Sequence, residues 1–497
     1  MRPEHELETS APRPNSNPGV PDGAPRRCNC GRHSPRLKNP LLTGDLVIAA
    51  RDRAREPELP EATVARALST PIAPRLARYD VILVSNGSGD EDRDARIAAE
   101  FARHEHRVFH LGNHTLGGER SAAPALNRID VPATVSRNSQ RLLETLEALR
   151  QKEGIEAAAL FTPGPLDVAS AREMHERWSW RIVAASDALP TLHGHADVRI
   201  SFDTAVAEEQ VERSVELPTS MTWPARWAAM DQAIRNSWPR ASIVVLTHDN
   251  LAFSRMCLTS VLENTEYPNF ELIVVDNASS DGTVEELQRI AGRFPNIKVI
   301  LNEHNAGFGP ANNQGLAAAT GEILVLLNND TVVPRGWLTR LARHLDDAAI
   351  GLIGPATNRS CNEAQIDIPY QTYGEFQAVA RSQGERYEGQ RFLIRMPMMF
   401  CVAFRRDTYE DLGPLDERYE IGMFEDEDYA LRAKAAGLQV AWTPEVYVHH
   451  AYHASIGKLL PTGDYMRLVK LNQGRFEEKW GICWERHRAL PASAPTP

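Results

Sequence analysis

Four apolar runs, each followed by polar residues, restrict the possible folds of this chain more than any other feature. They read SIVVL (242–246), FELIVV (270–275), IKVIL (297–301) and GEILVLL (321–327). Continuous runs rich in Val, Ile and Leu are typical of strands that are buried on both faces. Segments with helical spacing separate them. The pattern therefore predicts parallel βαβ units, in which a mostly parallel sheet lies between helices.

Polar residues follow the carboxyl end of each of these predicted strands. Ligands of open α/β sheets bind at those ends, so the clusters predict a ligand site. Its candidate residues are Thr247, Asp249, Asp276, Asp281, Asn305, Asn328 and Asp330. Asp276 can accept hydrogen bonds from a nucleobase or a ribose hydroxyl. The oxygen ligands around Asp330 suit Mg²⁺ or Mn²⁺, which take few carboxylates together with phosphate oxygens.

Two further clusters lie closer to the carboxyl terminus. MFEDEDYALRAKAAG (423–437) places four acids at the start of a predicted helix, where they complement the helix dipole. Clustered like charges also raise one another's pKa, which favours a general base. After a strand, His449, His450 and His453 offer imidazoles that can complete a metal shell. Because side chains alternate along a strand, His449 and His450 point to opposite faces, and only one of them can serve.

The remaining sequence divides the chain into further parts. Residues 1–40 are rich in Pro, Gly, Ser and charge, and we expect them to be disordered. From Tyr79 onward, short strands alternate with helical segments, which predicts a second parallel α/β sheet. The expected parts are a disordered tail (1–40), a Rossmann-like α/β domain (41–204), a helical connector (205–240), a catalytic domain (241–485) and a second tail (486–497).

Composition narrows the class of protein. The 497 residues carry a net charge of −11, which argues against a partner made of nucleic acid. The sequence contains no run of the roughly 20 apolar residues that a membrane helix needs, and the first 30 residues carry no apolar signal-peptide region. Six cysteines are too few for a disulfide scaffold, so a reducing cytoplasm is expected. We expect a cytoplasmic enzyme of several domains.

The motifs between residues 241 and 480 resemble, in order, those of glycosyltransferase family 2, whose members are inverting enzymes of the GT-A fold. The matching segments are SIVVLTHDN, ELIVVDNASSDGT, NAGFGPANNQGL, LLNNDT, GPLDERYEIGMFEDEDYALR and VHHAYHAS. In the metal motif, Asn328 replaces the first acid, a pattern similar to that of rhamnosyl- and related deoxysugar transferases. The amino-terminal half resembles, through YDVILVS, HEHRVFHL, LFTPGP and WSWRIVAASDALP, a degenerate Rossmann-like half of a GT-B glycosyltransferase.

The resemblance to family 2 implies a role for each matching residue. Asp426 would be the base that deprotonates the acceptor hydroxyl, with Asp428 as the runner-up. Asp330 and His450 would bind a divalent metal, Mg²⁺ or Mn²⁺, that bridges the diphosphate of the donor. The implied donor-binding residues are Thr247, Asp249, Asp276, Asn305, Gly307, Asn328 and Asn329.

The same resemblance implies the reaction and the partners. A sugar would pass with inversion from a UDP- or dTDP-linked donor to a hydroxyl of a glycan or of a lipid-linked glycan. The expected pathway is the synthesis of cell-surface polysaccharide or O-antigen. A lipid-linked acceptor would bring the protein to the inner face of the plasma membrane as a peripheral protein.

Other interpretations fit the sequence less well. An EF-hand loop built on DNASSDG would have Gln288 where the bidentate Glu belongs. A dehydrogenase lacks its GxGxxG turn, and a serine hydrolase lacks its GxSxG elbow. The remaining alternative is an inactive nucleotide-sugar-fold protein that acts as a binding or scaffold subunit of a glycan assembly complex. Asn328 in the metal motif favours that alternative, whereas the acids of 425–428 and His450 favour the enzyme.

Overall fold

The structure is a computed structural model. It describes residues 79–84, 91–104, 106–112, 126–130, 139–161, 173–175, 177–185, 198–201, 214–216, 221–451 and 464–486. The predicted tail 1–40, His453 and all of the second tail except Arg486 lie outside these residues.

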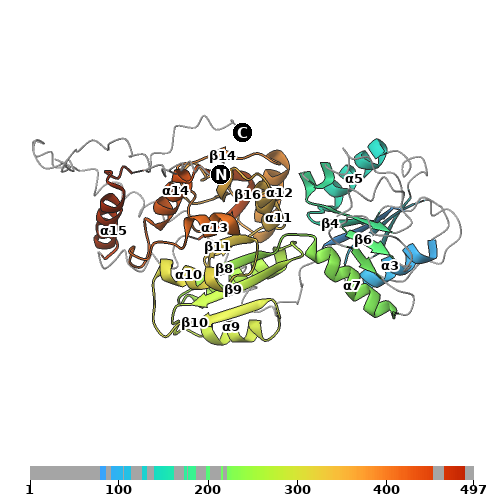
Figure 1. The fold of residues 1–497 in the computed structure, drawn as a ribbon, viewed down its shortest axis with the longest axis horizontal. Coiled ribbons are helices and arrows are strands. Elements are labelled where there is room, and N and C mark those ends of the chain that lie inside the picture. Colours follow the sequence, from blue (N-terminus) through green and yellow to red (C-terminus); the bar gives the residue numbers. More distant parts are fainter. Residues whose placement is uncertain are drawn as a thin grey trace, which may run out of the picture. The chain divides into compact units, whose positions relative to one another are not determined.

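The first sheet is the parallel sheet expected in the amino-terminal half (Figure 1). Its strands are β1 (Asp80–Val84), β2 (Val108–Gly112), β3 (Leu126–Asp130), β4 (Ala158–Phe161), β5 (Arg181–Ala185), β6 (Val198–Ser201) and β7 (Ser214–Glu216). All pair in parallel, in the order β3-β2-β1-β4-β5-β6-β7, which begins with the strand order of doubly wound Rossmann folds. Helices α3 (Glu91–Arg103) and α5 (Ser139–Glu153) connect strands of this sheet.

The predicted connector 205–240 differs from the structure in one respect. Besides the expected helix, α7 (Trp223–Asn236), it contains strand β7, which pairs with β6, so the first sheet continues past residue 204. Three residues are too few for an alternating pattern to reveal a strand. The resemblance of this half to a GT-B domain stays a prediction.

The second sheet has nine strands and contains the four predicted apolar runs. The strands are β8 (Ala241–Thr247), β9 (Phe270–Asp276), β10 (Ile297–Leu301), β11 (Ile323–Asn328), β12 (Thr331–Val332), β13 (Ile350–Thr357), β14 (Phe392–Leu393), β15 (Cys401–Arg405) and β16 (Gln439–His450). Their order is β10-β9-β8-β11-β15-β13-β16-β12, and β14 pairs with β16. Strands β10, β9, β8 and β11 are parallel, as predicted, whereas β15 runs antiparallel to β11.

Helices cover both faces of this sheet because its strands are apolar on both sides. The helices are α8 (Leu251–Asn264), α9 (Thr283–Ala291), α10 (Phe308–Ala318), α11 (Trp337–His344), α12 (Tyr373–Arg386), α13 (Arg406–Leu412), α14 (Glu425–Ala435) and α15 (Asp464–Trp480). Ile243 and Val245 belong to the hydrophobic cluster that contains residues of α8, α9 and α11, whereas Val244 belongs to the cluster that contains residues of α10 and α14. Gly315 allows α10 to lie close to β8, since a Cβ there would be 2.3 Å from Val244 Cγ1.

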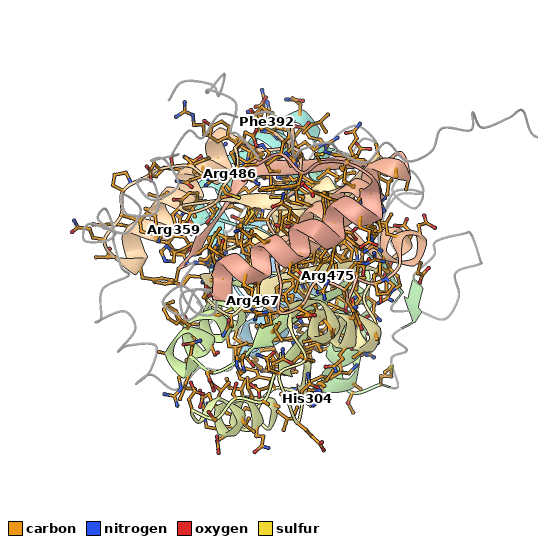
Figure 2. The ribbon with its side chains drawn as sticks, turned by 90° about the vertical axis from the view of Figure 1, so that its left-hand side faces the viewer. His304, Arg359, Phe392, Arg467, Arg475 and Arg486 are labelled. Atoms are coloured by element: carbon orange, nitrogen blue, oxygen red, sulfur yellow. The ribbon has the colours of Figure 1, made fainter. Side chains whose placement is uncertain are left out.

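The last helix, α15, completes this half of the chain (Figure 2). Its buried Phe476 packs against Phe424 at the start of α14, which ties α15 to the acidic cluster. In the described part of the chain, no helix combines the length and the apolar character that are needed to cross a membrane.

Candidate functional site

The predicted donor side begins where β8 and β9 end. Thr247 and Asp276 are partners in the parallel ladder, and the Thr247 hydroxyl donates to Asp276 Oδ1 at 2.8 Å. The Asp276 carboxylate also accepts hydrogen bonds from the backbone N–H and the hydroxyl of Ser279, at 2.8 and 2.5 Å. Both Thr247 and Asp276 are buried. Asp276 therefore shapes the loop after β9 in addition to its predicted contact with the donor.

A second set of contacts joins this loop to the one after β8. Asp249, a half-buried residue with φ of 51°, accepts a hydrogen bond from the N–H of Ser280 at 2.8 Å. Asp281 accepts one from the N–H of Leu251, also at 2.8 Å. Burial raises the pKa of Asp281, but hydrogen bonds from Thr283 and Leu251 outweigh it and hold the pKa below its usual value. Hydrogen bonds thus join the predicted residues that follow β8 to those that follow β9.

Asn277 organises the neighbouring Gly/Asn loop, although the sequence analysis did not assign it a role in the donor site. Its Nδ2 donates to Asn305 Oδ1 and to the carbonyl of Gly307, each at 3.1 Å. A Cβ on Gly307, whose φ is 89°, would lie 3.3 Å from the backbone nitrogen of Ile421. The signal for Asn277 is its position directly after Asp276, inside the segment ELIVVDNASSDGT that resembles the family.

Asp330 and His450 lie together on the same side of the second sheet. Asp330 Oδ1 is 3.3 Å from His450 Nε2, and both side chains are buried. Strands β12 and β16 set this geometry, because Thr331 pairs with His450 in their antiparallel ladder. The His450 ring stacks on Phe400, with centroids 4.7 Å apart. The two predicted metal ligands are therefore neighbours.

The residues next to this pair point elsewhere. His449 Nδ1 and the Tyr370 hydroxyl share a hydrogen bond of 2.6 Å beside an apolar cluster. Burial lowers the pKa of His449 to about 4. The alternation of side chains on β16 explains why His449 and His450 separate. Asn329, a predicted donor residue, donates its amide to Ser254 on α8 at 2.9 Å. Asn328 is half-buried at the end of β11.

The chemistry of the pair suits a divalent cation that is shared with a ligand. Among the residues that the structure describes, no three His, Cys, Asp or Glu side chains gather as a metal site. One carboxylate and one imidazole leave most of the coordination shell for other oxygens. Mg²⁺ and Mn²⁺ at phosphate-binding sites take few protein ligands and complete their shell with phosphate oxygens and water. Asp330 and His450 therefore fit such a metal.

The acidic cluster begins at a strained segment of backbone. Four consecutive residues, Ile421 to Phe424, have positive φ, and three of them carry side chains. Such conformations cost about 1–3 kcal/mol each and persist only where the surroundings enforce them, as at functional sites. Buried Asn472 of α15 supplies part of the restraint, because its amide donates to the carbonyls of Glu420 and Gly422 at 3.1 and 2.8 Å. Nothing in the sequence pattern indicated this role.

The four acids of 425–428 fall into two pairs with different surroundings. Burial raises the pKa of Glu425 to about 8, and the charge of neighbouring Asp426 adds to the effect. Burial also raises the pKa of Asp426 to about 6, opposed by the N–H of Glu427, which donates to Asp426 Oδ1 at 2.8 Å. The side chain of Asp426 is half-buried. These are the surroundings expected of a general base near neutral pH.

Asp428 and Glu427 instead hold the structure together. Asp428, fully buried, forms ion pairs with Lys479 at 2.6 Å and with Arg432 at 3.1 Å, and accepts a hydrogen bond from Trp480 Nε1 at 2.9 Å. Glu427 pairs with Arg395 at 2.9 Å. The structure thus surrounds the runner-up base, Asp428, with cations and leaves Asp426 as the better placed of the two.

Asp428→Asn tests this division of roles. We expect the free energy of unfolding to fall by about 2–3 kcal/mol, because hydrogen bonds to charged groups contribute about that much and two cations lose their counter-charge. Urea denaturation measures the change, with Asp411→Asn, an exposed aspartate of α13, as the matched control. Loss of activity in Asp428→Asn without loss of stability would contradict the structural role.

Comparison with known proteins finds a family model that matches part of this half of the chain. Residues 242–413 match the family model described as glycosyl transferase family 2. An uncharacterized protein, y4gI, of Sinorhizobium fredii is 26% identical over 297 residues, covering 56% of this chain and 32% of that protein. The O-antigen biosynthesis protein RfbC of Myxococcus xanthus is 27% identical over 250 residues, covering 46% and 18%. The matches thus span less than a third of these relatives' own lengths.

Among solved structures, the mannosyltransferase PcManGT from Pyrobaculum calidifontis, in complex with GDP-Man and Mn²⁺, aligns with 48% of this chain and 64% of its own. The sequence identity is 20% and the TM-score is 0.36. The segment that matches the family model runs from β8 to α13, where helices alternate with strands. Residues 242–413 therefore form a domain that matches glycosyl transferase family 2 and has a mixed α/β architecture.

Proposed function

We propose that the protein moves a sugar, with inversion, from a UDP- or dTDP-linked donor to a hydroxyl of a glycan or a lipid-linked glycan. The observation that carries the proposal is the pairing of Asp330, inside the segment that matches family 2, with His450, at 3.3 Å. An inactive scaffold subunit would have no need of a strained helix start or of acids with raised pKa values.

In this proposal, Asp426 is the general base. With a pKa of about 6, its carboxylate is mostly ionised at neutral pH and can take the proton of the acceptor hydroxyl. Glu425, with a pKa of about 8, stays largely protonated at pH 7 and so does not add a second negative charge beside the base. The loop of Ile421 to Phe424 fixes the position of both side chains.

Asp330 and His450 would hold the divalent metal. When bound, Mg²⁺ or Mn²⁺ stabilises negative charge on the departing diphosphate. His450 is positioned by its stacking on Phe400 and by Asn358, whose side-chain oxygen accepts a hydrogen bond from the His450 N–H at 2.8 Å. The loops after β8 and β9, with Asp249 and Asp276, would recognise the nucleoside, and Asn305 and Gly307 would line its far side.

The cellular setting is part of the same proposal. The name of RfbC refers to O-antigen biosynthesis, which supports a role in cell-surface polysaccharide synthesis for this chain as well. Such a role places the enzyme in the cytoplasm, at the inner face of the plasma membrane, when its acceptor is linked to a lipid.

A donor screen tests the proposal. We expect UDP- or dTDP-sugars with Mn²⁺ to raise the melting temperature, because a ligand that binds only the folded state stabilises it by about 2.7 kcal/mol at a hundredfold excess over its Kd. GDP-sugars and Mn²⁺ alone serve as controls. An unchanged melting temperature with all donors would contradict a nucleotide-sugar site.

A further inference from the structure

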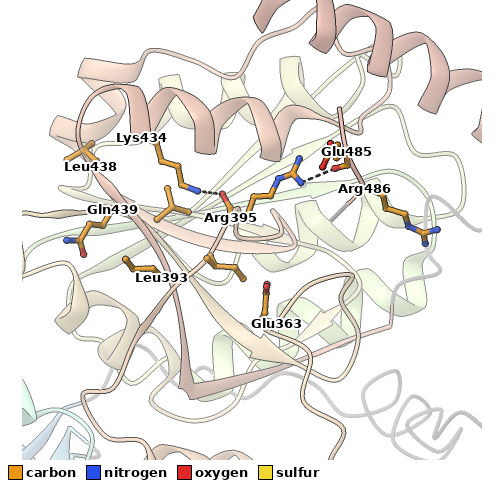
Figure 3. A pocket seen from close by; sticks show the side chains of 10 residues that line it. Glu363, Leu393, Arg395, Lys434, Leu438, Gln439, Glu485 and Arg486 are labelled. Atoms are coloured by element: carbon orange, nitrogen blue, oxygen red, sulfur yellow. Dashed lines mark hydrogen bonds between the residues drawn. The ribbon is translucent and has the colours of Figure 1, made fainter. Parts of the chain in front are cut away.

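A cavity of about 1000 Å³ opens at the side of α14, apart from every motif that was matched to the family (Figure 3). Its walls come from the segment after β14, the last turn of α14, the start of β16 and the residues after α15. Ligand pockets in proteins have about 300–1,000 Å³, so the cavity can hold more than one sugar unit. None of the residues proposed for the donor or the metal lines it.

The charges of the cavity are mixed. Arg395, Lys434 and Arg486 contribute positive charge, and Glu363 and Glu485 contribute negative charge. The charge of Arg395 is further offset by its ion pair with Glu427. In Figure 3, Lys434 reaches the backbone of Arg395 and donates to its carbonyl at 2.6 Å. An anionic ligand would need a larger surplus of cations, whereas sugar hydroxyls both donate and accept and so match a mixed lining.

An exposed apolar surface adjoins these charges. The side chain of Leu393, which lines the cavity, is 69% exposed, although it lies on a strand. Phe392, beside it on β14, is 36% exposed and packs on Trp442, with ring centroids 5.6 Å apart. Leu393, Phe392 and Trp442 thus form a small apolar surface at the edge of the cavity. The apolar C–H faces of sugar rings can pack on it, while the densely charged rim does not suit a lipid chain.

The cavity borders α14, the helix that begins with the acidic cluster. Arg395 lines the cavity and pairs with Glu427, which follows the proposed base Asp426 in the chain. Lys434 lies two turns further along α14, about 12 Å from Asp426 along the helix axis at 1.5 Å per residue. Asp426 and the cavity thus lie along one helix, and an acceptor must be longer than a single sugar to contact both.

We propose that this cavity binds the sugar units of the acceptor that precede the reacting one, so that the acceptor is a largely neutral oligosaccharide rather than a single sugar. This inference rests on the proposed function, because it names the acceptor of the same site. Leu393 and Lys434 determine its affinity for the glycan and take no part in donor binding.

Binding to an array of immobilised glycans tests the inference without knowledge of the natural acceptor. The array carries neutral and uronate-bearing sugars from mono- to hexasaccharides, and the full chain is applied as wild type, Leu393→Asp and Lys434→Ala. Leu301→Asp is the matched control, since Leu301 is also an exposed strand residue but lies on β10 at the opposite edge of the sheet. Calorimetry with UDP or dTDP and Mn²⁺ follows the donor site separately.

We expect a neutral glycan series in which binding strengthens with chain length and weakens roughly tenfold in both Leu393→Asp and Lys434→Ala. Leu301→Asp should bind like wild type. Binding to no glycan, binding confined to uronate-bearing glycans, or binding unaffected by Leu393→Asp would overturn the inference. Failure of the proposed function gives a different result, because donor binding is then absent while glycan binding persists.

Discussion

Asp426→Asn is expected to reduce kcat by a factor of about 10²–10⁴, the usual contribution of a general base. The substitution keeps the shape of the side chain but removes the carboxylate that would accept the acceptor proton. The N–H of Glu427 can still donate to the remaining oxygen, so the start of α14 should keep its structure. Release of the nucleoside diphosphate in a coupled assay measures kcat, and calorimetry should show unchanged donor affinity.

The pH dependence provides a second readout of the same residue. Because burial raises the pKa of Asp426 to about 6, the wild-type rate should fall as the pH drops through about 6, where the base becomes protonated. If the base had the unperturbed pKa of an exposed aspartate, about 4, the rate of the enzyme would fall only near that lower pH. Asp411→Asn, on the exposed side of α13, should keep the wild-type profile. Near-normal turnover in Asp426→Asn would exclude Asp426 as the base.

Asp330→Ala is expected to abolish the dependence of donor binding on Mn²⁺. In the wild type we expect Mn²⁺ to tighten binding of UDP or dTDP by at least about tenfold, because the cation would be held between the Asp330–His450 pair and the diphosphate. Without the carboxylate, His450 alone supplies the protein's share of the metal shell. Calorimetric titrations with Mn²⁺ and with EDTA should then give the same weak affinity.

The matched control for this second prediction is Asp411→Ala. It removes the same carboxylate from an exposed position on α13. It should retain the full difference between Mn²⁺ and EDTA. If Asp330→Ala also retained that difference, Asp330 would not be a metal ligand. The alternative of an inactive scaffold subunit would then gain support, since Asp330 is the single acid of the motif Asn328-Asn329-Asp330.

The framework of the second sheet could be predicted because local sequence determines it. The runs that become β8, β9, β10 and β11 are rich in Val, Ile and Leu and are followed by polar residues, and the structure places them as parallel neighbours. The edge strand β10, with Lys298 and an exposed Leu301, is less buried than the other three. The separation of His449 from His450 also followed from the period of a strand. Strand β7 was missed because three residues carry no periodic signal.

The details of the candidate site depend on contacts between distant segments and were therefore harder to predict. Asp426 and Asp428 look alike in the sequence, yet of the two it is Asp428 that pairs with Lys479 of α15. Asn472 restrains the strained loop from a position 49 residues or more away. The cavity beside α14 combines Leu393, Lys434 and Arg486, which no local motif connects. Such pairings follow from tertiary packing, which a single sequence does not display.

The central claim, transfer of a sugar with inversion from a nucleotide sugar, is tested most directly by following the anomeric protons of the donor by NMR. The protein is mixed with Mn²⁺ and, in turn, α-linked UDP- and dTDP-sugars, with water as the acceptor. The account predicts that one donor is consumed, that the first sugar released is the β anomer, and that Asp426→Asn releases far less of it. Persistence of every donor, or first release of the α anomer, would contradict the account.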